Sequence, residues 1–202
     1  MRALPPGARL LELGAGGAHV AALARRPDLH WLGLESALDC LGALRCRLSG
    51  GAIVDLESLP RLPDGFDAIL AGDVLEHLAD PARLLRLAHA ALPAGGRLLV
   101  SVPNVANLYV RLNLLIGRFP HADRGILDRT HRVFFTAGSL RRLLEAAGFA
   151  VERRMVSTIP LPLVWPRLPG ALLGALSGSL ALVTRLVPKL LGYQLLVEAR
   201  RR

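Results

Sequence analysis

Aromatic residues and lysine are scarce in this chain. Its 202 residues include five Phe, two Trp and two Tyr, and Lys189 is the only lysine among 25 basic residues. The net charge of +9 and the pI of about 11.2 therefore come from arginines scattered along the sequence. Nucleic-acid enzymes combine basic grooves with aromatic stacking platforms, and no such platform accompanies these arginines. We expect solvated arginines and no nucleic-acid partner, with an anionic membrane surface or substrate as the alternative use of the charge.

Cysteine is equally scarce. Cys40 and Cys46 are six positions apart and form neither a C-x-x-C motif nor a cluster with histidine, so no metal site is predicted. Two small apolar thiols are typical of a reduced compartment. The first residues lack the apolar core of a signal peptide, because Glu12 interrupts the run. We therefore expect a cytoplasmic protein.

Apolar runs with strand character alternate with runs at helical spacing. This alternation predicts one α/β domain over residues 1–202, with a mostly parallel sheet covered by helices on both faces. Sheets of this kind bind ligands at the carboxyl ends of their strands. The predicted strands are 8–13, 30–35, 52–56, 66–72, 97–102 and 149–156. The predicted helices are 18–25, 38–48 and 81–92, the last with Asp80 as its cap. A further helix, capped by Thr136 or Ser139, is predicted to end at Gly148.

The first predicted strand runs into a glycine-rich turn, in the stretch LELGAGGAHV. Gly14 and Gly16 allow a tight turn and a close approach of a ligand to the backbone. A dinucleotide fingerprint that starts at Gly14 needs glycine at position 19, which is His19, so a nicotinamide-dependent enzyme is the weaker alternative. Glu12, at the buried end of a strand, needs a positive partner, and the ammonium group of a ligand would supply one.

Polar residues also follow the next three predicted strands. Glu35 lies 21 positions beyond the first glycine of the turn, near the spacing of about 20 for a carboxylate that holds a ribose diol. Asp55, followed by Leu56, is placed to accept a hydrogen bond from an adenine amino group, although a lone aspartate is also an ordinary turn residue. Gly72 and Asp73 are expected to line the same ligand site.

Together these motifs resemble the class I S-adenosylmethionine-dependent methyltransferases. The likeness rests on LELGAGGA, GLES, VDLESLPRLPDGFDAIL, GDVLEHLADP and LPAGGRLLVSVPN, in the expected order. It implies a Rossmann-like, doubly wound, three-layer α/β/α fold whose seven-stranded, mostly parallel sheet has an antiparallel last strand. It also implies S-adenosylmethionine as cofactor, with residues 1–103 as the cofactor-binding half of the methyltransferase domain and 104–202 as the acceptor-site half.

The resemblance further assigns roles residue by residue. The family's third turn glycine is Ala18 here, which leaves a methyl group near the ligand. Only eight residues precede the first strand, so either the acceptor site is more open than in relatives or the chain is truncated. The implied cofactor contacts are Glu12 facing the amino end of the methionine, Gly14, Ala15 and Gly16 packing against it, Glu35 holding the ribose, Asp55 and Leu56 flanking the adenine, and Gly72 and Asp73 beside the sulfonium.

The stretch GILDRTHRVFF carries the predicted acceptor chemistry. Methyl transfer from a sulfonium mostly needs alignment, and an oxygen acceptor also gains from a base. We expect His131 to be that base or to position the acceptor, with Asp128 orienting it or binding substrate hydroxyls. The alternative is a hydrogen-bonded loop that braces Phe134 and Phe135 in the core.

The region from ANLYVRLNLL to the last strand resembles small bacterial methyltransferases that often accompany glycosyltransferases in surface-polysaccharide or lipid-linked glycan pathways. This resemblance implies O-methylation of a sugar, a lipid-linked hydroxyl or a quinone-like acceptor. A cofactor-binding scaffold without catalysis, serving a glycan-pathway partner, is the other interpretation.

The segment 155–184 carries a single charge, Arg167, and its longest uncharged stretch has 17 residues, at the short edge of the range of about 17–25 for a membrane span. Gly, Ser and Pro dilute it and the chain must return to the sheet, so a span is disfavoured. Three interpretations remain: a cover for the substrate channel, a packing helix of a homodimer, and a helix lying on the membrane. The last predicts peripheral membrane contact through 155–190, aided by flanking basic residues.

Overall fold

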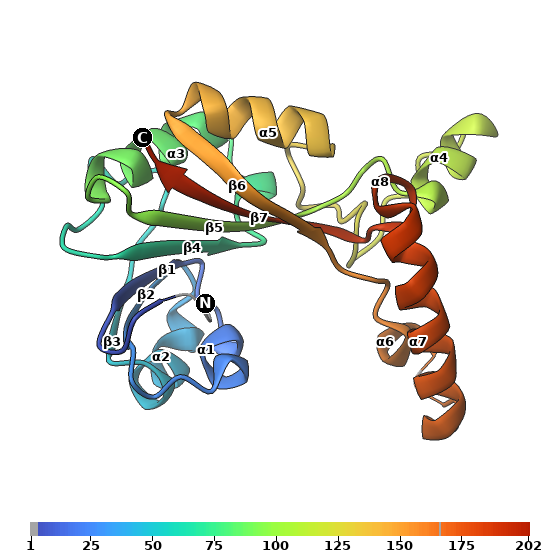
Figure 1. Ribbon diagram of the computed structural model, residues 1–202, viewed down its shortest axis with the longest axis horizontal. Coiled ribbons are helices and arrows are strands. Elements are labelled where there is room, and N and C mark those ends of the chain that lie inside the picture. The colour runs from blue at the N-terminus through green and yellow to red at the C-terminus, as the bar shows by residue number, and fades with distance from the viewer. Residues whose placement is uncertain (1–3, 166) are drawn as a thin grey trace.

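A computed structural model describes residues 4–165 and 167–202 as a single twisted sheet with helices on both faces (Figure 1). The strand order is β3-β2-β1-β4-β5-β7-β6, and β7 runs antiparallel to both of its neighbours, β5 and β6, while the pairs among the other strands are parallel. The predicted doubly wound, seven-stranded α/β fold is thereby confirmed. The strands are β1 (Arg9–Leu13), β2 (His30–Glu35), β3 (Gly50–Ile53), β4 (Ala68–Gly72), β5 (Arg97–Pro103), β6 (Phe149–Val156) and β7 (Gln194–Arg201).

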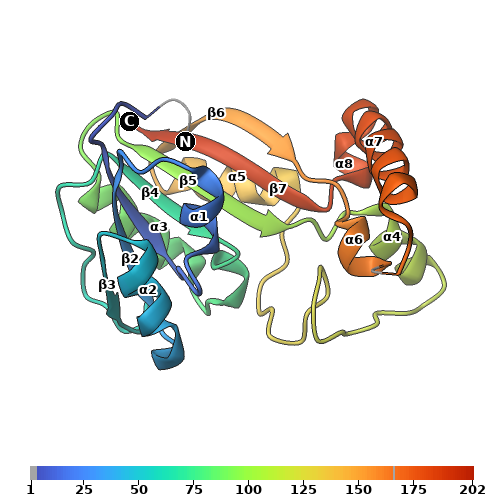
Figure 2. The ribbon, with the colours of Figure 1, turned by 90° about the horizontal axis from the view of Figure 1, so that it is seen from below.

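Helices cover the two faces unequally. In Figures 1 and 2, α1 (His19–Ala24) and α2 (Leu41–Arg47) lie on one face, and α3 (Pro81–Ala91) and α5 (Ala137–Ala146) on the other. The largest buried cluster lies under α3 and α5, because both present apolar residues at helical spacing to the sheet. The remaining helices are α4 (Leu108–Leu115), α6 (Leu161–Val164), α7 (Gly170–Leu186), α8 (Pro188–Leu191) and the 3₁₀ helices η1 (Leu38–Cys40) and η2 (Leu75–His77).

The predicted helix caps form. Asp80 accepts a hydrogen bond from the Arg83 amide at 2.9 Å, with Pro81 in the first turn of α3. At α5 the two predicted alternatives act together: the Ser139 amide donates to Thr136 Oγ1, and the Thr136 amide donates to Ser139 Oγ. This reciprocal pair fixes where the helix begins.

The third strand differs from its prediction. It covers Gly50–Ile53 instead of 52–56, so Gly50 and Gly51, which precede the predicted strand, are part of it. A Cβ on Gly51 would lie 3.0 Å from Leu44 Cβ, so helix α2 packs too closely for a larger residue. Glycine here therefore allows close packing, and Asp55 lies in the loop beyond the strand.

The helices α4, α6, α7 and α8 gather beyond the sheet, toward the carboxyl ends of its parallel strands (Figures 1 and 2). Two buried amides join this region to the sheet: the side chains of Asn104 and Asn107 each donate to the Gly192 carbonyl at 2.9 Å. Within residues 4–165 and 167–202, no helix is both long enough and apolar enough to cross a membrane.

Candidate active site

The glycine turn after β1 is closed on one side and open on the other. Gly14 and Gly16 both have positive φ, of 64° and 49°. A Cβ on Gly14 would lie 2.5 Å from Val74 Cγ2, whereas a Cβ on Gly16 would meet no atom within 4 Å. Ala18 shares the left-handed conformation, with φ of 54°, at a position where an L-residue is strained. The open side at Gly16 is a cradle in which a ligand can approach the backbone.

Glu35 closes one end of this cradle. Its Oε2 accepts from the Gly16 amide at 2.6 Å, and its Oε1 accepts from the amides of Ser36 and Ala37. Burial acts to raise the pKa of this carboxyl, but the backbone donors outweigh burial and lower it below its ordinary value. Glu35 is therefore an ionised carboxylate fixed beside the turn, where the sequence predicted a ribose-binding acid.

Glu12 is buried just before the turn. Burial raises the pKa of its carboxyl to about 7, and its Oε2 has no hydrogen-bond partner among the described residues. An ionised carboxylate in such a position is costly until a cation approaches it. The position fits the ammonium group of a ligand that lies in the cradle.

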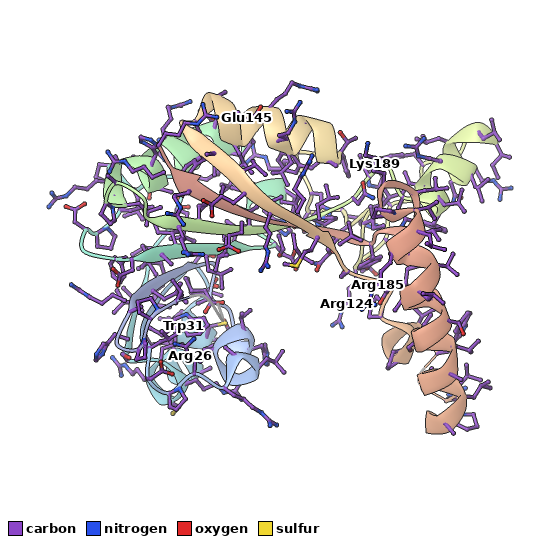
Figure 3. The ribbon with its side chains drawn as sticks, in the orientation of Figure 1. Arg26, Trp31, Arg124, Glu145, Arg185 and Lys189 are labelled. Atoms are coloured by element: carbon purple, nitrogen blue, oxygen red, sulfur yellow. The ribbon has the colours of Figure 1, made fainter. Side chains whose placement is uncertain are left out.

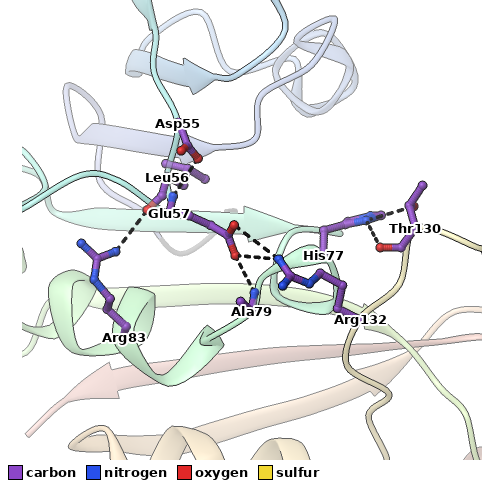
Figure 4. Close-up of polar contacts among 8 residues, drawn as sticks. All are labelled: Asp55, Leu56, Glu57, His77, Ala79, Arg83, Thr130 and Arg132. Atoms are coloured by element: carbon purple, nitrogen blue, oxygen red, sulfur yellow. Dashed lines mark hydrogen bonds and ion pairs between the residues drawn. The ribbon is translucent and has the colours of Figure 1, made fainter.

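The loop after β3 is connected to the segment that follows His131 (Figure 4). Asp55 is exposed and accepts from the Glu57 amide at 2.9 Å, while the side chain of Leu56 is buried. Glu57 pairs with Arg132 at 3.2 Å, and Arg83 donates to the Leu56 carbonyl. The predicted adenine-side residues are thus held in one framework with the loop that carries Asp128 and His131.

The fourth strand ends at Gly72, and Asp73 follows with a positive φ of 54°. Gln194 Nε2 donates to both Asp73 carboxylate oxygens at 2.9 Å, and Ser101 Oγ donates at 3.2 Å. A cavity of about 520 Å³ opens beside Asp73. The predicted residues Asp73, Asp128 and His131 all line it, together with Glu76, His77 and Tyr193.

His131 lies half-buried in the wall of this cavity. Its Nδ1 is 3.1 Å from the Ile126 carbonyl, which can only accept, so Nδ1 carries the proton and Nε2 keeps a lone pair. Burial lowers the pKa of the imidazole, so the ring is neutral near pH 7. Its ring meets that of His77 edge-on, with centroids 4.9 Å apart.

Asp128 makes its hydrogen bonds to Thr130. The carboxylate accepts from the Thr130 hydroxyl at 2.6 Å and from the Thr130 amide at 2.8 Å, which lowers the pKa of Asp128. The same hydroxyl lies 3.1 Å from His77 Nδ1 (Figure 4). The hydrogen-bonded chain therefore runs from Asp128 to His77, whereas the sequence suggested that Asp128 orients His131.

The loop also has the structural role that the sequence left open. Phe135 is buried in the main core, and Phe134 packs against the buried Ile126 and Leu127. Apolar side chains anchor the loop while its polar side chains line the cavity, so the two interpretations are compatible.

Glu76, Thr130 and Gln194 are among the residues of this site that were not singled out from the sequence. Glu76 lies in the apolar run VLEHL, and an acid in such a run is a signal comparable to that of Glu12. Thr130 lies between two predicted residues, in the motif DRTH. Gln194 offers no signal, since it reaches Asp73 from a strand 121 positions away.

Comparison with known families decides what kind of domain this is. A family model described as a methyltransferase domain matches residues 1–153. The chain belongs to this family. The predicted resemblance to S-adenosylmethionine-dependent methyltransferases is confirmed, and with it the cofactor.

Among curated proteins, this methyltransferase domain is similar to the ubiquinone biosynthesis O-methyltransferases of Aeromonas salmonicida and Xylella fastidiosa. The first is 30% identical over 156 residues, which cover 72% of the chain and 64% of the relative. The second is 33% identical over 155 residues, which cover 72% and 62%. The chain thus spans less than two thirds of the length of these relatives.

Among solved structures, the domain resembles an S-adenosylmethionine-dependent methyltransferase from Mesorhizobium loti, with a TM-score of 0.64, 22% identity and coverage of 98% of this chain and 94% of that one. It also resembles the magnesium protoporphyrin IX methyltransferase of Synechocystis with bound S-adenosylhomocysteine, with a TM-score of 0.66, 14% identity and coverage of 98% and 75%. These likenesses support the fold.

Proposed function

We propose that the domain transfers the methyl group of S-adenosylmethionine to a hydroxyl of a small or lipid-linked acceptor, with a quinone-like phenol as the first candidate and a sugar as the second. The observation that carries this proposal is the cavity of about 520 Å³ beside Asp73, because carboxylates and imidazoles suited to hydroxyl chemistry line it at the carboxyl ends of the strands. The O-methyltransferase names of the relatives point the same way.

The cofactor would lie along the cradle. Glu12 offers its unpaired carboxylate oxygen to the ammonium group, and Gly16 leaves room for the methionine chain. Glu35 offers its remaining lone pairs to the ribose hydroxyls. Asp55 and Leu56 would flank the adenine, while Gly14, Ala15, Gly72 and Asp73 complete the predicted contacts along the strand ends.

The cofactor supplies an already activated methyl group, so the chain mainly has to place an acceptor oxygen in line with it. Such positioning accounts for about 7–11 kcal/mol of a barrier. Asp73, held by Gln194 and Ser101, lines the cavity, and the side chain of the next residue, Val74, lies against Gly14 of the turn. His131, neutral and with a free Nε2, either takes the hydroxyl proton or positions the acceptor.

The test uses labelled S-adenosylmethionine with a panel of phenols, catechols and sugars, and mass spectrometry to find the methylated atom. His131→Gln should lower turnover by about 10²–10⁴-fold with unchanged cofactor affinity. His30→Gln, at an exposed histidine at the start of β2, is the matched control. Unchanged turnover of His131→Gln on the true acceptor would remove His131 from the mechanism, and methylation on nitrogen or carbon only would refute O-methylation.

We further propose that the domain meets its acceptor at an anionic membrane surface. Helices α4 and α7 project beyond the carboxyl ends of the parallel strands (Figures 1 and 2). The cavity lies at the same strand ends, since Asp73 and Gln194 line it. The exposed fraction is 62% for Leu182 and 75% for Leu186 on α7, and exposed basic residues, including Arg185 and Lys189, lie alongside (Figure 3). Apolar area beside cations is typical of a peripheral membrane helix. The other large exposed side chains of α4 and α7 include Tyr109, Leu112, Leu114, Leu115, Leu172, Leu176 and Val183.

Sedimentation with vesicles tests this second proposal. The domain should bind phosphatidylglycerol vesicles at low salt, and much less in high salt or with phosphatidylcholine alone. The double variant Leu182→Glu/Leu186→Glu should lose binding, whereas Leu23→Glu, at an equally exposed leucine of α1, should keep it. Absence of binding at low salt, or a dimer in solution that buries α7, would contradict the proposal.

A further inference from the structure

Glu76 is a buried acid that the positioning of the acceptor does not explain. It is 1% exposed, and neither of its carboxylate oxygens has a hydrogen-bond partner within residues 4–165 and 167–202. An apolar residue would be less costly at this position. Buried acids are usually paired with a cation or coordinate a metal, and no basic side chain in the described part of the chain fills this role.

The backbone around Glu76 holds a second segment against it. The Glu76 carbonyl accepts from the amides of Arg132 at 2.7 Å and Val133 at 3.0 Å. These bonds bring His131 next to η2, although the two segments are more than 50 positions apart in the chain. The proximity of Glu76, His77 and His131 is therefore built into the fold and does not depend on exposed side chains alone.

Both histidines are oriented through the same ring nitrogen. His131 Nδ1 donates to the Ile126 carbonyl, and His77 Nδ1 donates to Thr130 Oγ1, which in turn donates to Asp128. Each ring therefore keeps the lone pair of Nε2 free. Metal-binding histidines typically show this arrangement, in which the other ring nitrogen donates to a carbonyl or, through a short chain, to a carboxylate.

We propose that Glu76, His77 and His131 form a binding site for a divalent transition-metal ion of the zinc type. One ligand atom from each side chain lies within 4.8 Å of the other two. Ligands of one zinc ion are about 2.0–2.2 Å from it, hence roughly 3–4 Å from each other, so small side-chain rotations complete the set. One carboxylate and two imidazoles are a ligand set of catalytic zinc sites, which leave a position open for substrate.

This step rests on the proposed O-methylation: the open position on the ion would bind the hydroxyl of an acceptor in the cavity. A divalent ion bound there would lower the pKa of an acceptor hydroxyl, which would give its proton to solvent. The acceptor oxygen would then form the bond to the methyl carbon, and the electrons of the carbon–sulfur bond would return to sulfur. His131 would in this case position the acceptor through the ion. A catechol or other vicinal diol, with two oxygens for one ion, is the favoured acceptor class.

The test uses the full chain without a polyhistidine tag, stripped by a chelator and titrated calorimetrically with Zn²⁺. One equivalent should bind, and Mg²⁺, which prefers oxygen ligands, should bind far more weakly. Glu76→Gln and His131→Gln should each weaken Zn²⁺ binding at least tenfold. Thr130→Val, which removes the hydroxyl acceptor 3.1 Å from His77 Nδ1 and leaves the Thr130 carbonyl at 3.4 Å, should weaken it by about 10–100-fold. His30→Gln should bind as the unmodified chain does.

Co²⁺ bound in place of Zn²⁺ has a visible absorption band, which is a second readout that does not depend on enzyme activity. This band should disappear in Glu76→Gln. Zn²⁺ binding that survives both Glu76→Gln and His131→Gln, or that never saturates, would overturn the site. O-methylation that continues in the presence of chelator, without saturable Zn²⁺ binding, would refute the metal inference and leave the proposed function standing. Saturable Zn²⁺ binding without methylation of any hydroxyl would refute the proposed function and leave the metal site standing.

Discussion

Replacement of Glu12 by Gln should change how the stability of the domain depends on pH. The folded state holds the pKa of Glu12 near 7, and the ordinary value is 4.5. Below pH 4.5 the carboxyl is protonated in both states. As the pH rises from 4.5 to 7 the unfolded chain ionises first, so the free energy of unfolding falls, and it stays lower above pH 7.

The magnitude follows from the size of the shift. Each unit of pKa difference corresponds to about 1.4 kcal/mol, so between pH 5 and pH 8 Glu12 should cost the cofactor-free domain about 2–3 kcal/mol of stability. Glu12→Gln should lack this loss. Burial also raises the pKa of Glu76, to about 8, but that group titrates in both proteins and cancels in the comparison.

Urea denaturation of both proteins at several pH values measures the effect, provided that the m-value stays constant. Saturating S-adenosylmethionine should reduce the difference, since its ammonium group stabilises the ionised carboxylate of Glu12. Parallel stability curves of the two proteins from pH 5 to pH 8 without cofactor would refute the reasoning about burial. We expect the stability curves of the two proteins to run parallel only when the cofactor is present.

Two further pairs of substitutions test the turn and a helix cap. Gly14→Ala should lower the free energy of unfolding by about 2–3 kcal/mol, because it adds a clash with Val74 to the strain of positive φ. Gly16→Ala has the strain without the clash, so it should lower the free energy of unfolding by about 1 kcal/mol. It should also weaken cofactor binding. Equal losses of stability in Gly14→Ala and Gly16→Ala would contradict the geometry of the turn. Asp80→Ala should cost about 1 kcal/mol by removing the cap of α3, and Asp80→Asn should not; chemical denaturation measures both.

Local patterns predicted most of the sheet. The runs HWLGLE and FAVERRMV form β2 and β6 with the predicted ends, because apolar runs bounded by turn residues have few other ways to bury their side chains. The error at β3 has a tertiary cause. Gly50 and Gly51 read locally as a turn, but helix α2 packs so closely over Gly51 that glycine is favoured inside the strand.

The candidate site was predictable where its residues directly follow strands. Glu12, Glu35 and Asp73 fall at strand ends, and topology brings such positions to one edge of the sheet. The acceptor side depends on contacts over long sequence separations. The pairing of Gln194 with Asp73, and of Thr130 with His77, cannot be read from either segment alone.

The central claim is that the strand ends hold two adjoining half-sites, one for the cofactor and one for the acceptor. Calorimetric titration of S-adenosylmethionine into three proteins tests it most directly. Glu35→Ala should weaken binding tenfold or more, at least about 1.4 kcal/mol, whereas His131→Gln should bind the cofactor as tightly as the unmodified chain. Wild-type affinity in Glu35→Ala, or a comparable loss in His131→Gln, would contradict this division of the site.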